Sequence, residues 1–451
     1  MSVTSAKGFQ ASGVAAGLKS NGDPDLALVV NIGPLDAAAG VFTTNRVKAA
    51  PVLWSEQVLK AGRLTAVVLN SGGANACTGP AGFQDTHATA ERVAERLGCG
   101  AADVAVCSTG VIGVRLPIDA LLSGVDAAAA ALGTAATADG GGAATADATT
   151  ATAGATGNGA NTTADADAYG NGNAYGNADG NGNAYGNADG NGNGNGNGKN
   201  TTPGGTAAAR AIMTTDTHPK TTTIHGNGFV VGGMAKGAGM LAPALATMLC
   251  VLTTDAIADA DTLDAALRAA TARTFDRIDS DGCMSTNDTV LLLASGASGV
   301  RPSAEELEAA VTQACQDLSR QLIGDAEGAS KEIAITITGA ATEAEAVTVA
   351  RAIARNNLLM CALFGNDAYW GRVLAAVGTT DATFDPDQLD VSFNGVQVCK
   401  NGAADPDAPT VDISGRDLAV GVDLHAGTAE ATVYTNDLTL AYVHENSAYT
   451  S

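Results

Sequence analysis

The order of hydrophobic and polar positions predicts a chain that mixes strands and helices. Short apolar runs bounded by turn residues are typical of buried strands. They occur at residues 26–32, 65–70 and 104–107, and around Val230, Leu291 and Ile335. Residues 391–399 alternate on either side of Asn394-Gly395, which predicts a two-stranded hairpin.

A helix is predicted at residues 118–132, and helical periodicity is clearest in four other segments, namely residues 87–97, 262–274, 304–322 and 343–356. Ser303 with Glu306 and Thr342 with Glu345 have the spacing of capping boxes, which marks the starts of the last two helices. Strands and helices do not alternate strictly along the chain, so the predicted fold class is α+β. The length of 451 residues allows about two to four domains.

The pattern disappears in residues 134–206, which contain no Leu, Ile, Val, Phe, Met or Trp. Within this insert the sequence NGNAYGNADG at residues 171–180 recurs unchanged at 181–190. Such a segment buries too little apolar surface to offset its ordering entropy, so we expect a disordered surface loop. A calcium-binding β-roll is the alternative, but the acidic positions are sparse and the apolar position of that repeat is missing.

Composition excludes several classes of partner. The net charge is −23 with only 24 Lys and Arg, so no basic stripe for nucleic acid or anionic membranes is expected. A single lysine can still bind a small anion. No secretory signal is visible at the N-terminus, and the longest apolar run, near residues 241–252, is shorter than the ~20 residues that a membrane helix needs.

The eight cysteines form no C-x-x-C pair, and most lie in apolar runs. We therefore interpret them as reduced core residues of a cytosolic protein. The five histidines lack metal-ligand spacing, so no metal site is expected. The chain also lacks the P-loop, dinucleotide-binding and G-x-S-x-G motifs.

The candidate chemistry lies in residues 236–255, KGAGMLAPALATMLCVLTTD. Small residues and Pro243 precede Ala246-Thr247, and an apolar run follows. A hydroxyl between such an approach and a buried strand suits self-cleavage between Ala246 and Thr247. Cleavage would give Thr247 a free α-amine, with a pKa near ~7.7–8.0, as its own base. The alternative is a threonine that merely caps a core strand.

Several segments in order resemble the ornithine acetyltransferase (glutamate N-acetyltransferase) family of arginine biosynthesis. Besides residues 236–255 they are NSGGANACTG at 70–79, STGVIG at 108–113, IMTTDT at 212–217, STNDTVLLLASG at 285–296, IGDAEGASK at 323–331 and the C-terminal YVHENSAY. The resemblance covers nearly the whole chain except the insert.

This resemblance implies an acetyltransferase that moves acetyl from N2-acetylornithine to glutamate through an acetyl-threonine. It implies no cofactor, although acetyl-CoA is a candidate second donor. The implied fold is a double-layered αββα arrangement of the self-processing N-terminal-nucleophile type. Self-cleavage would give chains 1–246 and 247–451, interlocked and assembled as an α2β2 heterotetramer in the cytoplasm.

The resemblance also implies roles for individual residues. Thr109 and Gly110 follow a strand and precede a Gly-rich turn, where a hydroxyl and a free N–H could form an oxyanion hole. Lys236 would bind a substrate carboxylate, and Glu327 would bind the side-chain ammonium. The remaining substrate contacts implied are Thr214, Asn446, Thr247 and the terminal Ser451.

One segment departs from the family. The pattern VKTA followed by G-x-D-P-N-W-G-R is replaced by a sequence in which Met360 occupies the lysine position and Ala368-Tyr369 the Pro-Asn pair. These changes predict altered substrate geometry. They motivate one alternative, an inactive relative that acts as a binding protein. The other alternative is a self-cleaving amidohydrolase or aminopeptidase, in which water replaces the amine acceptor.

Overall fold

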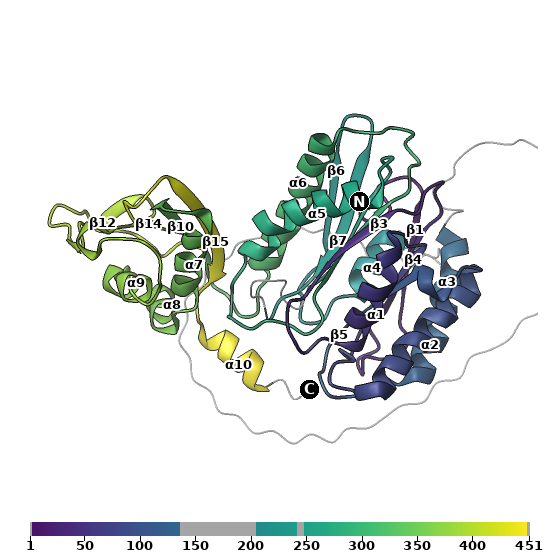
Figure 1. Ribbon diagram of the computed structural model, residues 1–451. Helices are drawn as coiled ribbons and strands as arrows, with labels where there is room; N and C mark the ends of the chain where they lie inside the picture. The colour runs from purple at the N-terminus through teal and green to yellow at the C-terminus, as the bar shows by residue number, and fades with distance from the viewer. Residues whose placement is uncertain (1, 136–203, 241–247, 449–451) are drawn as a thin grey trace, which may run out of the picture. The chain divides into compact units, whose positions relative to one another are not determined.

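The strands form three sheets in a computed structural model that describes residues 2–135, 204–240 and 248–448 (Figure 1). The four-stranded sheet contains, in spatial order, β1 (Phe9–Val14), β2 (Leu26–Asn31), β4 (Ala66–Ser71) and β5 (Val104–Thr109). The five-stranded sheet contains β3 (Ala38–Phe42), β9 (Thr289–Ala294), β8 (Leu249–Thr254), β7 (Val230–Lys236) and β6 (Lys220–His225).

The six-stranded sheet belongs to the C-terminal third of the chain. In spatial order it contains β13 (Ala403–Ala404), β12 (Val396–Lys400), β11 (Asp390–Phe393), β14 (Asp417–Asp423), β10 (Glu332–Ala340) and β15 (Ala429–Asn436). The helices are α1 (Ala50–Val58), α2 (Gly79–Leu97), α3 (Ile118–Ala135), α4 (Gly204–Ala211), α5 (Ala260–Arg273), α6 (Ala304–Gly324), α7 (Glu343–Ala354), α8 (Asn357–Phe364), α9 (Trp370–Val377) and α10 (Leu440–Ala448). The predicted α+β class is confirmed.

The four- and five-stranded sheets are buried on both faces, because successive side chains of their strands belong to two different cores. In β4, Val67 and Leu69 belong to a core shared with the five-stranded sheet, while the neighbouring Val68 packs with α2 and α3. In β8, Val251 belongs to the shared core and Leu252 packs with α5 and α6. Successive side chains point to opposite faces, so a strand covered on both sides has a continuous apolar sequence.

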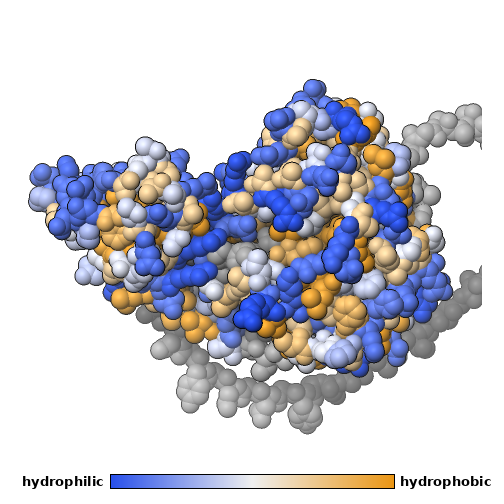
Figure 2. Space-filling model, viewed as in Figure 1, coloured by the Kyte–Doolittle hydropathy of each residue, from blue (hydrophilic) through white to orange (hydrophobic). Residues whose placement is uncertain are grey.

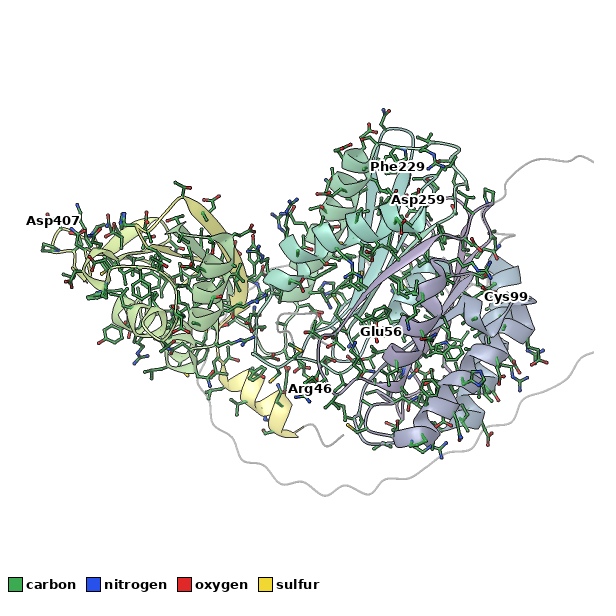
Figure 3. All side chains as sticks on the ribbon, viewed as in Figure 1. Arg46, Glu56, Cys99, Phe229, Asp259 and Asp407 are labelled. Atoms are coloured by element: carbon green, nitrogen blue, oxygen red, sulfur yellow. The ribbon has the colours of Figure 1, made fainter. Side chains whose placement is uncertain are left out.

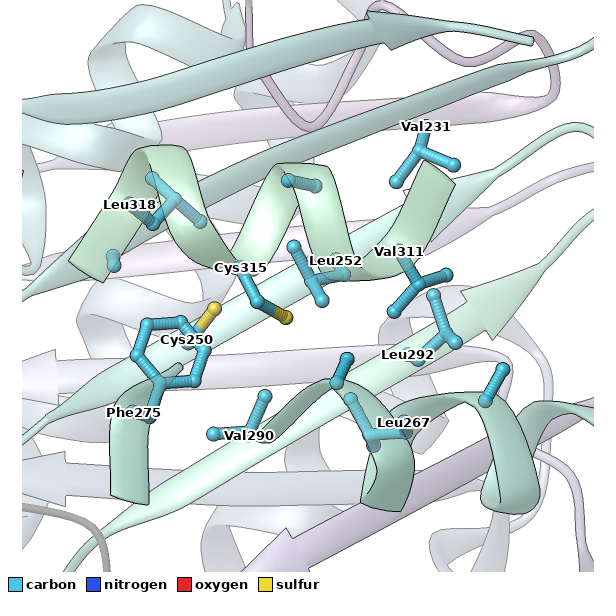
Figure 4. Close-up of a cluster of buried hydrophobic side chains, with 14 of the residues drawn as sticks. Val231, Cys250, Leu252, Leu267, Phe275, Val290, Leu292, Val311, Cys315 and Leu318 are labelled. Atoms are coloured by element: carbon cyan, nitrogen blue, oxygen red, sulfur yellow. The ribbon is translucent and has the colours of Figure 1, made fainter. Parts of the chain in front are cut away.

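Helices α5 and α6 cover the outer face of the five-stranded sheet (Figure 1). Figure 4 shows this core, in which Cys315 and Leu318 of α6 lie beside Cys250 and Leu252 of β8. Asp259 begins α5 by accepting a hydrogen bond from the Thr262 N–H at 2.9 Å (Figure 3). The six-stranded sheet has a separate core with α7, α8 and α9.

The strands predicted from apolar runs are all present, and so is the hairpin. Asn394 and Gly395 both have positive φ, 48° and 78°, as the tight turn between β11 and β12 requires. Of the predicted helices, α2 begins at Gly79, eight residues before its periodic stretch, because its first turns carry small residues and Pro80 at a position that tolerates proline.

One of the two predicted capping boxes is wrong. Ser303 and Glu306 exchange both hydrogen bonds at the start of α6. Thr342 accepts the Glu345 N–H at the start of α7, but the Glu345 carboxylate accepts the Thr383 N–H instead of returning to Thr342. A loop from another part of the chain therefore competes with the local bond.

The limits predicted for the insert also need correction. Residues 134–135 complete α3 and residues 204–206 begin α4, so the helices extend into both ends of the insert. The prediction of disorder for the rest of the insert lies outside the described residues. Both flanking helices border β1, since Ser12 Oγ donates to the Ala128 carbonyl of α3 and Gly13 lies against the Ala207 carbonyl of α4. The two ends of the insert are thus attached to the same strand.

The cysteine prediction is correct for half of the residues. All eight are described and free; Cys107, Cys250, Cys315 and Cys399 are buried, whereas Cys99 is half-buried and Cys77, Cys283 and Cys361 are exposed. Among the described helices, none alone is long and apolar enough to cross a membrane, and one bent pair, α7 with α8, passes by length and composition. Figure 2 shows hydrophilic residues spread over the visible face, with hydrophobic residues between them.

Candidate active site

A cavity of about 600 Å³ lies where β5, β7 and the C-terminal helix α10 come together. Its lining residues are Thr109, Gly110, Val111, Thr214, Thr215, Lys236, Gly239, Met240, Glu327, His444, Glu445 and Asn446. Six of the residues singled out from the sequence are among them: Thr109, Gly110, Thr214, Lys236, Glu327 and Asn446. Ala246, Thr247 and Ser451 lie outside the described residues. Residues far apart in the sequence therefore share one cavity.

The end of β5 forms a turn packed against the glycine-rich segment after β4. The Thr109 carbonyl accepts the N–H groups of Gly72 and Gly73 at 2.9 and 3.0 Å. Gly110 has φ 131°, and a Cβ there would lie 2.5 Å from the Gly73 nitrogen. Only glycine fits such a close approach, which explains why the motifs at 70–79 and 108–113 both contain glycine.

The end of β7 and the start of β8 lie beside each other at the cavity. These strands are antiparallel, and Lys236, the last residue of β7, pairs with Leu249, the first of β8. Lys236 Nζ donates to Thr109 Oγ1 at 3.2 Å. Met248 directly follows Thr247 in the chain and directly precedes Leu249, so the neighbour of the predicted nucleophile is one residue from the strand pair that contains Lys236.

Lys236 is buried, whereas most lysine side chains are exposed to solvent. It is 2% exposed, and burial lowers its pKa while the charge of Asp216 opposes that change. The Asp216 carboxylate accepts the N–H groups of Gly237 at 2.7 Å and of Thr214 at 3.0 Å. Although burial alone would raise its pKa, the charges of Lys236 and Lys220 hold the pKa of Asp216 at about 2.

Asp216 is part of a buried ionic network that connects three segments of the site. Lys220 Nζ lies 2.5 Å from both Asp216 Oδ1 and Asp325 Oδ2. Asp325 also accepts the Thr217 N–H at 3.0 Å. The network joins the segment that contains Thr214 to the end of β7 and to the turn that contains Glu327.

Glu327 is one of two described carboxylates that line the cavity, the other being Glu445. Its backbone N–H donates to the Ala238 carbonyl at 2.9 Å, and its carboxylate accepts from Thr215 Oγ1 at 2.7 Å and from Asn446 Nδ2 at 3.1 Å. Asp325 is the C-cap of α6, and Glu327 lies in the turn two residues beyond it. Asn446 belongs to α10, which is docked through Thr439 Oγ1 on the Gly328 carbonyl at 2.6 Å.

Sequence reasoning missed Asp216, Asn287 and Asp288. Asp288 is fully buried, and its Oδ1 accepts the Met248 N–H at 3.0 Å. Burial raises the pKa of Asp288 well above its usual range. The sequence did contain a signal, because MTTDT and STNDT each place one acidic residue among hydroxyl-bearing or apolar residues. A carboxylate in such a motif is expected to have specific partners, since carboxylates are rarely buried without them.

The residues that depart from the family pattern do not line the cavity. Met360 is 3% exposed in α8 and belongs to the core of the six-stranded sheet. Ala368 packs against that same core, and the half-exposed Tyr369 lies under the Arg372 guanidinium at 5.3 Å. None of the three is among the described residues that line the cavity, and the expectation of altered substrate geometry stays a prediction. Within the described residues, no group of three His, Cys, Asp or Glu side chains could hold a metal ion.

A cavity with converging charged groups at the junction of several strand ends is the usual setting of a small-molecule binding or active site. The chain belongs to the ArgJ family, which matches residues 10–173 and 190–451, and the predicted resemblance is confirmed. It is 56% identical over 451 residues to the arginine biosynthesis bifunctional protein ArgJ of Streptomyces coelicolor, with all of both chains covered. It is 51% identical over 455 residues to the protein of the same name from Mycobacterium tuberculosis, covering all of this chain and 96% of that one.

Among solved structures, the chain is similar to the ornithine acetyltransferase of Mycobacterium tuberculosis complexed with ornithine. Identity is 45%, the match covers 54% of this chain and 94% of that chain, and the TM-score is 0.36. A TM-score of that size is too low to establish a shared fold.

Proposed function

We propose that the chain cleaves itself before Thr247 and then transfers acetyl from N2-acetylornithine to glutamate through an acetyl ester on Thr247. The enzyme class, an acetyltransferase of arginine biosynthesis, is confirmed by full-length identity above 50% to bifunctional ArgJ proteins. The same identity disfavours both the amidohydrolase and the inactive relative. The cleavage, the nucleophile and the roles of individual residues are our proposal.

The observation that most supports this proposal is one cavity lined by both a buried cation and an anion from different segments of the chain. Lys236 lies beside Thr109, and Glu327 lies on the wall formed with Asn446 and Thr215. Ornithine carries an α-carboxylate and a side-chain ammonium, so it can pair with both charges at once. Binding in that direction would place the α-nitrogen, and the acetyl on it, nearest the carboxylate end, at the Thr109-Gly110 turn.

The proposed chemistry has two half-reactions. The Thr247 α-amine takes the proton of the Thr247 hydroxyl, whose oxygen attacks the acetyl carbon of N2-acetylornithine. The C–N bond then breaks, the α-ammonium returns the proton to the leaving amine, and ornithine departs. In the second half the glutamate amine attacks the acetyl ester and loses a proton to the Thr247 α-amine. The C–O bond breaks, the α-ammonium returns that proton to the Thr247 oxygen, and N-acetylglutamate leaves with Thr247 restored.

Each half-reaction develops negative charge on the acetyl oxygen, which requires fixed donors. The Thr109 hydroxyl and the Gly110 N–H suit that role, because Gly72 and Gly73 fix the turn and both Thr109 and Gly110 line the cavity. No cofactor is needed for acyl transfer of this kind. Acetyl-CoA is proposed as a second acetyl donor to the same threonine.

Strand order supports self-cleavage into two chains that stay together. Strands β3, β6 and β7 precede residue 247, whereas β8 and β9 follow it, and all five share one sheet. The cores on the two faces of that sheet support the αββα layering, with α5 and α6 outside one sheet and α2 and α3 outside the other. An α2β2 heterotetramer in the cytoplasm completes the proposal.

Steady-state kinetics test the mechanism. A single acetyl-threonine that alternates between donor and acceptor gives ping-pong behaviour, so double-reciprocal plots at several glutamate concentrations should be parallel. Intersecting lines would indicate a ternary complex and direct transfer. A denaturing gel of the purified protein should show two fragments, and Thr247→Ala should remain one inactive chain.

A further inference from the structure

The side chains of Asn287 and Asp288 connect the two strand ends that form the site. Asn287 Nδ2 donates to the carbonyl of Ser108 at 2.8 Å and to that of Ala74 at 2.6 Å. Asp288 Oδ1 accepts the N–H of Met248 at 3.0 Å. One residue thus holds the end of β5 and the next holds the residue before β8.

The contacted backbone groups are the covalent neighbours of the reacting groups. Ser108 directly precedes Thr109, and Met248 directly follows Thr247. The peptide unit is planar, so a hydrogen bond that fixes one residue's carbonyl or N–H restricts where the adjoining residue can lie. The two adjacent side chains therefore act on both sides of the proposed reaction, the oxyanion turn and the nucleophile.

The Asn287–Asp288 pair is itself held rigidly. Asn287 is 3% exposed and Asp288 is fully buried. Thr43 N–H donates to the Asp288 carbonyl at 3.0 Å, and Thr286 Oγ1 donates to Asn287 Oδ1 at 2.6 Å. Strand β9 begins at the next residue, Thr289, which pairs with Leu249 of β8. Because Asn287 and Asp288 are themselves fixed, they can hold the two backbone groups that they bind at a fixed separation.

We propose that Asn287 and Asp288 are positioning residues that hold Met248 and the Thr109-Gly110 turn in place relative to each other and act on Thr247 through Met248. This inference rests on the proposed function, because it takes Thr247 as the nucleophile. Acyl transfer requires the attacking oxygen and the oxyanion donors to be fixed relative to each other, and small misplacements reduce the rate steeply.

A purely structural role explains the pair less well. Asp288 is fully buried, and burial raises the pKa of its carboxyl well above the usual range although hydrogen bonds from Ser285 and Thr43 oppose that change. Burying a carboxyl costs free energy, and a hydrophobic residue of similar size would avoid the cost. Only a side chain with an acceptor in this position can hold the Met248 N–H.

The test compares Asp288→Ala with Asp288→Asn in the full chain. The alanine variant releases the Met248 N–H, so self-cleavage should slow and the kcat of the cleaved enzyme should fall about a hundredfold, with KM nearly unchanged. The asparagine variant keeps an oxygen at the Oδ1 position and should recover most of the kcat. Asn287→Gln keeps the amide but displaces it by one methylene, and it should lower kcat in the same way if Asp288→Ala does not fold.

Asp255 offers a matched control. It is 1% exposed, and its Oδ1 accepts the N–H of Val230, the first residue of β7, at 2.7 Å. It follows the other end of β8, about 20 Å from Met248 at the usual rise per residue. Asp255→Ala should lower the melting temperature without changing the kcat of the folded enzyme.

Equal kcat values for folded Asp288→Ala, Asp255→Ala and wild type would overturn the inference. So would an Asp288→Asn variant as slow as Asp288→Ala, because the acceptor oxygen would then not be the relevant group. Failure of the proposed function is distinguishable, because in that case the wild-type chain itself would neither split before Thr247 nor form an acetyl ester there.

Discussion

At the scale of single residues, Lys236 has a position that its sequence context alone does not reveal. It is buried, lines the cavity, donates to Thr109 Oγ1 and is acted on by the charge of Asp216. The sequence indicated a charge in an uncharged stretch, and the structure adds the partners that hold it there. A buried lysine with an open cavity beside it suits an anionic group of the substrate.

Lys236→Met tests this role. A lost charge-assisted hydrogen bond to the substrate carboxylate should cost about 1.5–3 kcal/mol, which lowers kcat/KM roughly ten- to a hundredfold. Lys331→Met is the control, because Lys331 is also buried, at 3% exposure, but donates to the Ile413 and Gly415 carbonyls outside the cavity. If both variants keep wild-type kcat/KM once folded, Lys236 does not bind substrate.

Asp216 leads to a prediction about acid stability. Its pKa is about 2 in the folded protein, below its ordinary value of 3.8, so the charged form stabilises the fold above the ordinary value. That contribution, on the order of 2 kcal/mol, is lost as the pH falls from about 4 to about 2. Denaturant unfolding at several pH values should show a smaller loss across this window in Asp216→Asn, which is already less stable at pH 7. Parallel pH profiles for the two proteins would contradict the assignment.

The sequence predicted only those cavity residues that the resemblance to the family implied. Thr109, Gly110, Thr214, Lys236, Glu327 and Asn446 lie together as the resemblance implied. Asp216 and Asp288 could not be placed, because their importance depends on burial and on backbone partners from distant segments. The sequence shows a carboxylate but not which N–H groups it will meet.

At the scale of elements, apolar runs predicted the strands that are covered on both faces. Strands β2, β4, β5, β8 and β9 are buried at every position, so their sequences are continuous and easily recognised. Strands β3 and β6 lie at the two edges of their sheet and have short or polar sequences. No apolar run predicted either of them. Because a strand at the edge of a sheet is less covered, it needs fewer apolar residues and lacks the continuous apolar run by which a strand is predicted.

Capping differs between two helices and gives a prediction at this scale. Ser303 and Glu306 form a reciprocal box at α6, whereas Thr342 caps α7 without the return bond. Ser303→Ala should destabilise the protein by about 1 kcal/mol. Glu306→Ala should add a smaller loss, while Glu345→Ala should affect stability through the Thr383 N–H that it binds. Chemical denaturation of the four proteins, wild type included, measures these differences; identical midpoints for wild type and Ser303→Ala would contradict the capping role.

At the scale of the whole molecule, the five-stranded sheet joins segments from both sides of residue 247. The pairs β3–β9 and β7–β8 each join a strand before residue 247 to a strand after it. A cut before Thr247 would therefore leave every strand of the sheet hydrogen-bonded to its neighbours. The fragments 1–246 and 247–451 should therefore elute together under native conditions and separate only in denaturant. Fragments that separate by gel filtration without denaturant would contradict this account.

The insert should contribute little to catalysis. Both helices that flank it border β1, so a short connection can replace the chain between them. Substituting residues 140–200 with a Gly/Ser linker a tenth as long should leave cleavage and turnover unchanged and recover about 2 kcal/mol of closure entropy. A calcium-dependent circular dichroism change that disappears with this substitution would favour the β-roll instead.

The central claim is that Thr247 becomes the N-terminal residue of a second chain and carries the acetyl group during transfer. Mass spectrometry of the protein incubated with N2-acetylornithine alone, and quenched before glutamate is added, measures this directly. The account predicts one added acetyl group on the peptide that begins with Thr247, and its removal when glutamate is supplied. An intact chain, or an acetyl group found elsewhere while that peptide stays unmodified, would contradict it.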